Sequence, residues 1–202
     1  MDALRLASLL SSRLCHDLVG PASAVVNGLE LVDMEGGSVD KEALDLVATS
    51  AAQVTTRLQI YRGAYGVAAG LTLADARKSA VAFFANSKVK LDWPDALPSD
   101  GLPPSASKLV LNMLLLGAEL LGRGGRLAVV RDGPDVAVRV LGEAMRTEDL
   151  ALLDTASGAD DSVTPRNVQP FYLGRLAAAA GRRVAVASPA PGDLRLTLRG
   201  GD

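Results

Sequence analysis

Histidine and cysteine are the scarcest chemically reactive residues in this chain, because each occurs once, as His16 and Cys15. A single cysteine excludes an internal disulfide and any metal site built from several cysteines, and a single histidine excludes every catalytic arrangement that needs two. Positive charge is not in excess either, since 21 Lys and Arg stand against 23 Asp and Glu, for a net charge of −2. The chain therefore has no basic field that would hold nucleic acid at physiological salt.

Long apolar runs are also lacking. Arg5, Ser8 and Arg13 interrupt the apolar residues near the start, and no stretch approaches the about 20 apolar residues that a membrane span needs. We therefore expect a cytoplasmic protein. With 49% hydrophobic and 22% charged residues over 202 positions, the composition indicates a folded globular chain with room for one domain or two.

Two apolar stripes near the start of the sequence predict a pair of long helices. Residues spaced alternately by four and three form the first stripe, which consists of Leu18, Ala22, Val25, Leu29 and Val32. A similar spacing gives the second stripe: Leu44, Val47, Ala51, Val54, Leu58, Tyr61 and Tyr65. Between them, Glu35-Gly36-Gly37-Ser38 predicts a turn with Ser38 as a helix cap.

The two helices are expected to form an antiparallel hairpin whose apolar seams are too wide for two helices to cover. Two copies of the chain would then form a dimeric four-helix bundle, which buries the remaining apolar surface. Packing of the hairpin against the C-terminal half is the alternative, and the sequence leaves it open.

Three glycines between Arg62 and Gly70 mark a domain break, which divides a helical hairpin over 1–66 from a second domain over 71–202. In the second domain, hydrophobic patterning predicts helices over 73–84, 108–121 and 171–180. Strands are expected over 88–93, 127–130, 136–140, 183–187 and 194–198, with a hairpin turn at 132–134. The predicted fold class is α+β, with the second domain an α/β sandwich of one mixed sheet and helices on one face.

His16 lies about 160° around the first helix from its apolar stripe, so its ring is expected to point outward. A polar face of mostly small residues surrounds it, formed by Ser12, Arg13, Gly20, Ser23, Asn27 and Glu30. A neutral imidazole carries a lone pair near neutral pH and can attack an acyl phosphate without first losing a proton. We therefore expect His16 to be a nucleophile that accepts a phosphoryl group.

The neighbours of His16 suggest supporting roles. Arg13 can bind phosphoryl oxygens through its guanidinium group, and Asp17 can hold the ring nitrogen that does not react. Gly20 removes side-chain bulk where a partner must approach, and Ser12, Ser23, Asn27 and Glu30 complete that partner surface. Cys15 lies beside the apolar stripe and is expected in the core.

The order His16-Asp17, three residues, then Pro21 is similar to the phosphoacceptor box of histidine kinases. A proline inside a helix costs about 3 kcal/mol and removes a backbone hydrogen bond, so Pro21 is expected to kink the helix just after the histidine. The segments 11–21, 27–31 and 167–176 closely resemble the ChpT family of histidine phosphotransferases from bacterial cell-cycle phosphorelays. The resemblance covers nearly the whole chain.

This resemblance implies a homodimer whose hairpin looks like a kinase dimerisation domain and whose C-terminal half looks like a kinase ATP-binding domain that binds no ATP. It also implies the partners: the receiver domain of a CckA-like hybrid histidine kinase as phosphoryl donor, and CtrA-like and CpdR-like response regulators as acceptors. We expect this chain to bind no cofactor or metal of its own, with Mg²⁺ supplied by the partner receiver domain.

The residues that kinases use for ATP can be sought independently of the resemblance. Gly117 occupies the position where a metal-binding Asn is expected, with Asn112 out of register, and no Asp-x-Gly-x-Gly sequence occurs. Residues 169–174, at the place of a phosphate-binding loop, are too bulky for close backbone approach. The expected enzyme is a protein phosphotransferase that works through phosphohistidine and is not an ATP-dependent kinase. An active kinase and a non-enzymatic dimeric adaptor, docking on receiver or kinase domains, are the competing hypotheses.

Overall fold

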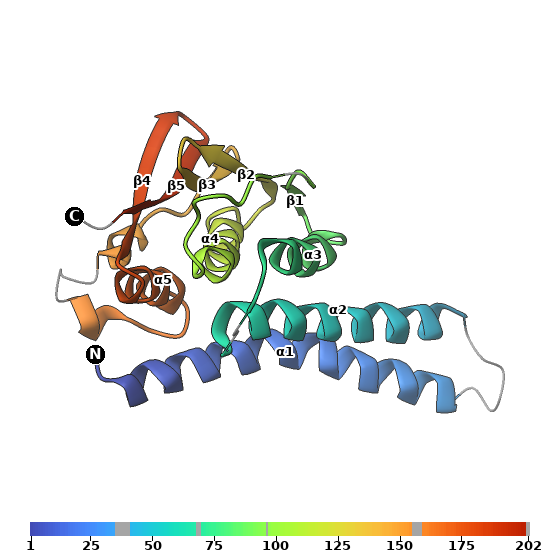
Figure 1. Ribbon diagram of the computed structural model, residues 1–202. Helices are drawn as coiled ribbons and strands as arrows, with labels where there is room; N and C mark the ends of the chain where they lie inside the picture. Colours follow the sequence, from blue (N-terminus) through green and yellow to red (C-terminus); the bar gives the residue numbers. More distant parts are fainter. Residues whose placement is uncertain (35–40, 68–69, 96, 155–158, 201–202) are drawn as a thin grey trace.

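The computed structural model of the chain describes residues 1–34, 41–67, 70–95, 97–154 and 159–200 (Figure 1). Helix α1 (Ala3–Met34) and helix α2 (Lys41–Tyr65) lie side by side as an antiparallel hairpin. The predicted turn at 35–38 and its Ser38 cap lie outside the described residues. Among the described residues, no helix is both long and apolar enough to cross a membrane.

Small residues bring the two helices of the hairpin close together. A Cβ atom added to Gly28 of α1 would lie 2.6 Å from Val47 Cγ2 of α2, which is closer than carbon atoms can pack. Ala43 of α2, whose carbonyl oxygen would lie 3.5 Å from the same added atom, is buried. The glycine therefore sets how closely the helices approach.

The predicted apolar stripes are divided between two environments. Val25 and Val47 are partly buried, whereas Leu29 and Leu58 are each 51% exposed in the single chain and Leu44 is 45% exposed. Helical spacing identifies which residues share a face, but it does not say which chain covers that face. The hairpin thus has apolar surface that neither of its own helices covers.

The C-terminal part continues with α3 (Leu73–Phe84), β1 (Val89–Asp92), α4 (Ala106–Leu120), β2 (Gly125–Asp132) and β3 (Asp135–Leu141). Short 3-10 turns at Leu150–Leu153 and Ala159–Ser162 then lead to α5 (Val168–Ala179), β4 (Arg182–Ala190) and β5 (Asp193–Gly200). The sheet order is β1-β2-β3-β5-β4, with β1 parallel to β2 and the other neighbours antiparallel. Helices α3, α4 and α5 lie between the sheet and the hairpin (Figure 1), so the predicted α+β class with one mixed sheet is confirmed.

Glycines allow the tight connections at both ends of β2. Gly133 adopts a φ of +61° between β2 and β3, in the left-handed region that the expected hairpin turn requires. At the joint between α4 and β2, a Cβ atom on Gly125 would lie 2.4 Å from the Leu141 carbonyl oxygen. Only glycine fits there, because any side chain would meet that oxygen.

One hydrophobic core joins the end of the hairpin to the C-terminal part. Ile60, Tyr61 and Ala64 of α2 belong to the same buried cluster as most of α4 and the inward-facing residues of the sheet. The expected break between 66 and 71 falls between the end of α2 and the start of α3. The hairpin therefore packs against the C-terminal part as well as leaving apolar surface exposed.

The start of α5 differs from its prediction, which began this helix at residue 171. Gln169 and Pro170 lie in the first turn of α5, which begins at Val168. Proline is tolerated there because the first backbone N–H groups of a helix have no partner within it.

Candidate functional site

His16 points away from the hairpin core, as predicted, with 89% of its side chain exposed. Its ring nitrogen Nδ1 lies 3.3 Å from Asp17 Oδ1. Because the carboxylate is on the Nδ1 side, Nε2 is the ring nitrogen left free for a partner. The geometry suits an imidazole that acts as a nucleophile.

The Asp17 carboxylate has a second contact across the hairpin. Its Oδ2 accepts a hydrogen bond of 2.9 Å from the Tyr61 hydroxyl of α2, and Arg13 Nε lies 4.0 Å from the same oxygen. Burial raises the pKa of Tyr61 to about 12, and the Asp17 charge acts in the same direction. Tyr61 therefore stays protonated throughout the physiological pH range, and its hydroxyl donates a hydrogen bond to Asp17.

Arg13 departs from its predicted orientation. The sequence placed it on the exposed face with His16, but its side chain is 13% exposed and forms an ion pair with Glu119 of α4. The long Arg13 side chain turns inward because the Glu119 carboxylate of α4 lies within its reach. Burial raises the pKa of Glu119 from its ordinary value of 4.5 to about 7, while the Arg13 charge opposes that rise.

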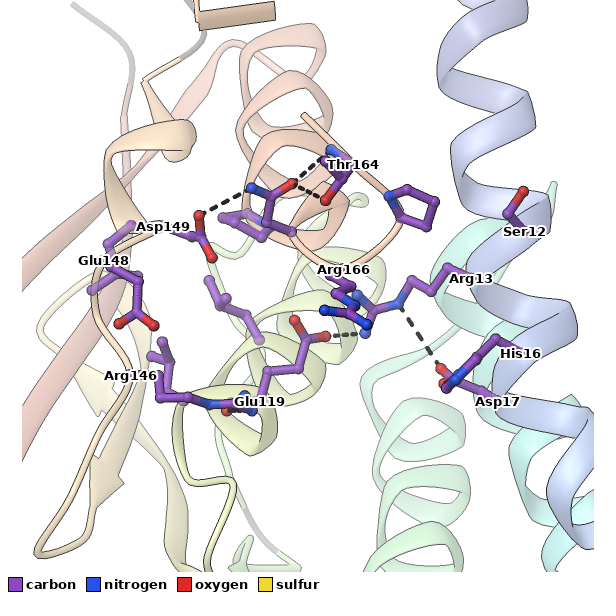
Figure 2. A pocket seen from close by; sticks show the side chains of 16 residues that line it. Ser12, Arg13, His16, Asp17, Glu119, Arg146, Glu148, Asp149, Thr164 and Arg166 are labelled. Atoms are coloured by element: carbon purple, nitrogen blue, oxygen red, sulfur yellow. Dashed lines mark hydrogen bonds and ion pairs between the residues drawn. The ribbon is translucent and has the colours of Figure 1, made fainter. Parts of the chain in front are cut away.

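A cleft of about 960 Å³ lies between α1 and the C-terminal part (Figure 2). Ser12, Arg13, His16 and Asp17 line it from α1, and Glu119 lines it from α4. The far wall comes from residues 146, 148–150 and 164–167, which carry Arg146 and Arg166 as well as Glu148 and Asp149. His16 is thus next to a space whose charged walls come from four segments of the chain.

The other residues predicted to meet a partner all lie exposed on α1: Ser12, Gly20, Ser23, Asn27 and Glu30. A Cβ atom added to Gly20 would have no neighbour within 4 Å, so the surface is open at that position. Pro21 lies inside α1, which is helical on both sides of it, and the axis of α1 changes direction near its middle (Figure 1).

The prediction that Cys15 is buried is wrong, because it is exposed in the single chain. Cys15 shares its side of α1 with Val19 and Val26, which are 60% and 54% exposed. These residues lie beside the first apolar stripe and are exposed in the single chain. An apolar pattern alone therefore predicted burial for Cys15 where α2 does not cover the surface.

A buried polar bridge between the hairpin and the C-terminal part was not predicted. Tyr65 donates a hydrogen bond of 2.5 Å to Gln169 Oε1, and Gln169 Nε2 donates to Asn112 O and Oδ1 at 3.1 Å. Asn112 Nδ2 in turn donates to the Ala64 carbonyl oxygen at 2.9 Å. A lone Asn in the strongly apolar run of α4 was the available signal, since a buried amide needs partners.

Comparison with known proteins agrees with this arrangement. A family model described as "Histidine phosphotransferase C-terminal domain" matches residues 73–192. The protein phosphotransferase ChpT of Brucella abortus (strain 2308) is 37% identical over 195 residues, covering 92% of this chain and 91% of that protein. A solved structure of a bacterial phosphotransferase has 34% identity and a TM-score of 0.82 over 98% of both chains. The chain belongs to the family of ChpT-like histidine phosphotransferases.

Proposed function

We propose that this chain carries phosphoryl groups on His16 within a bacterial phosphorelay. The donor is the receiver domain of a CckA-like hybrid histidine kinase, and the acceptors are the receivers of CtrA-like and CpdR-like response regulators that control the cell cycle. The observation that carries the proposal is the exposed His16 ring, which has Asp17 on its Nδ1 side and an open cleft beside it.

The transfer uses the two ring nitrogens differently. The Nε2 lone pair of neutral His16 forms a bond to phosphorus while the bond from phosphorus to the partner's aspartate oxygen breaks, and the electron pair leaves with the restored carboxylate. The proton on Nδ1 stays in place, and Asp17 stabilises the positive charge of the phosphorylated ring. Delivery to a second receiver reverses these bond changes.

The partner receiver domain provides the Mg²⁺ ion and the carboxylates that hold it. Mg²⁺ held by the carboxylates of the receiver domain neutralises charge on the phosphoryl group. Arg13 lies one turn before His16, and its contribution to the phosphoryl oxygens requires that it share or exchange its ion pair with Glu119. Exposed Ser12, Gly20 and Asn27 give a receiver domain close access to the ring.

The proposed active form is a homodimer. Val19, Val26 and Leu29 of α1, together with Leu44 and Leu58 of α2, are large apolar side chains that are between 45% and 60% exposed in the single chain. Side-by-side packing of two hairpins would bury both sets in a four-helix bundle. The His16 face of α1 is nearly opposite the first apolar stripe and stays accessible in that assembly.

The deciding experiment uses His16→Ala and a receiver domain that carries labelled phosphate, in the presence of Mg²⁺. The wild-type chain should acquire acid-labile phosphate, and the variant should fold normally but acquire none. Label on the variant would move the nucleophile elsewhere. If both proteins bind the receiver and neither acquires label, the chain acts as an adaptor; label from ATP alone would indicate a kinase.

A further inference from the structure

Tyr61 connects the reactive face of α1 to the neighbouring helix. Its hydroxyl donates to Asp17 Oδ2 at 2.9 Å, while the other carboxylate oxygen, Oδ1, lies 3.3 Å from His16 Nδ1. One carboxylate thus links a buried phenol to an exposed imidazole. The sequence spacing places Tyr61 in the second apolar stripe and predicts no part for it in the chemistry.

The His16 ring depends on Asp17 for its orientation. The side chain of His16 is 89% exposed, and within the described residues Asp17 is the one side chain with a polar contact to the ring. In a neutral imidazole, the hydrogen bond at one nitrogen decides which nitrogen carries the proton. The direction of the Asp17 carboxylate therefore decides whether the lone pair lies on Nε2.

Tyr61 is itself firmly held. It is 8% exposed, and its ring centroid lies 5.7 Å from that of Tyr65, which lies 5.3 Å from that of Tyr172 in α5. These ring contacts need no hydroxyl group, and they connect Tyr61 to α5 of the C-terminal part. The buried Tyr61 ring is therefore held by packing, with its hydroxyl directed at Asp17 of α1.

Arg13 does not replace Tyr61 in this role. Its Nε is 4.0 Å from Asp17 Oδ2, beyond hydrogen-bond distance, and its terminal nitrogen is bound to Glu119. The 2.9 Å bond from Tyr61 is the short, directional contact to this oxygen.

We propose that Tyr61 is a positioning residue for phosphoryl transfer: its hydroxyl orients Asp17, which then holds the proton on His16 Nδ1 and leaves the Nε2 lone pair free to attack. This role rests on the proposed function of His16. Tyr61 touches neither the ring nor the phosphoryl group and acts through Asp17.

Nitrogen NMR of the free protein tests the structural half of the proposal. Because His16 is the one histidine of the chain, ring labelling with ¹⁵N gives a single pair of signals that report its tautomer. At about pH 8.5, where an ordinary imidazole is neutral, the wild type should have its proton mainly on Nδ1. Tyr61→Phe, which keeps the ring, should move the proton toward Nε2.

Tyr65→Phe is the matched control, because it removes a partly buried phenol hydroxyl one turn along the same helix that is bonded to Gln169 and not to Asp17. Its histidine signals should match those of the wild type. Unchanged signals in Tyr61→Phe, or an equal change in both variants, would overturn the proposal. This reading needs no phosphoryl transfer, so it stands apart from any failure of the proposed function.

Transfer rates test the functional half. Loss of one hydrogen bond to a charged group should slow phosphoryl acceptance by Tyr61→Phe about tenfold. In an Asp17→Ala background, which already lacks the carboxylate, Tyr61→Phe should cause no further loss. An equal further loss in that background would mean that the Tyr61 hydroxyl acts by a route other than Asp17 and would contradict the proposal.

Discussion

At the scale of single residues, the ion pair between Arg13 and Glu119 joins side chains that are 106 positions apart in the sequence. It links the reactive end of the hairpin to α4. Glu119 has a pKa of about 7 in the folded chain, mainly because it is buried, compared with an ordinary value of 4.5. The folded protein therefore binds a proton at Glu119 more tightly than the unfolded protein does.

This pKa shift has a defined sign for stability. Where the folded state binds more protons than the unfolded state, the free energy of unfolding falls as pH rises. The contribution from Glu119 is present at low pH and is lost as pH rises from 4.5 to about 7. Compared with Glu119→Gln, the wild type should lose stability between these values, which urea melts of both proteins at about pH 5 and about pH 8 will measure. Parallel pH dependence in the two proteins would contradict the assignment.

Arg13→Ala should slow phosphoryl acceptance and also weaken the fold. Removal of the guanidinium leaves the Glu119 carboxylate without its partner, so we expect a loss of about 1–2 kcal/mol at about pH 8 that shrinks as Glu119 takes up a proton. Arg13→Lys is the control, because it keeps the charge but not the forked donors. It should recover stability more fully than transfer rate. An unchanged rate in Arg13→Ala would remove Arg13 from the mechanism.

The sequence predicts the position of a site residue only where the geometry of a single helix determines that position. The outward direction of His16 and the position of Asp17 follow from helical spacing over a few residues. The inward turn of Arg13 depends on Glu119, and the role of Tyr61 depends on which face of α2 meets α1, so neither could be derived from one helix alone. Cys15 illustrates the same limit, since an apolar pattern does not identify the surface that covers it.

At the scale of the elements, two glycines of α1 offer a controlled comparison. Gly28→Ala puts a methyl group 2.6 Å from Val47 Cγ2 and should lower stability by about 1–2 kcal/mol. Gly20→Ala meets nothing within 4 Å and should raise stability by about 0.5–1 kcal/mol, because alanine favours the helix. Urea denaturation followed by circular dichroism will measure both. Changes of the same sign would show that Gly28 does not set the helix spacing.

The order and type of the elements were largely predictable, because strong hydrophobic periodicity and glycine turns specify them. Strands β2 to β5 extend beyond their predicted ends, since hydrogen bonding to neighbours continues past the apolar positions, whereas β1 is shorter than the predicted 88–93. The predicted start of α5 is three residues late, because a proline can precede a helix as well as lie in its first turn.

At the scale of the whole molecule, the exposed apolar surface of the hairpin predicts assembly. Leu29 and Leu58 are each 51% exposed, so Leu29→Asp or Leu58→Asp should leave the protomer folded but bury an unpaired charge in a four-helix bundle. Sedimentation equilibrium should then report a monomer with an unchanged circular dichroism spectrum. Val186→Asp, at a 42% exposed position on β4, is the control and should remain a dimer. A dimer that persists in all three variants would refute the bundle.

The buried bridge from Tyr65 through Gln169 to Asn112 also has a kinetic consequence. Because hydrogen bonds and a shared core fix the hairpin to the C-terminal part, a partner that docks beside His16 meets a preorganised surface. Association then involves no cost of closing a hinge, and release does not wait for one to open. For the proposed carrier, which would serve several partners in turn, turnover would then be limited by encounter and chemistry and not by its own rearrangement.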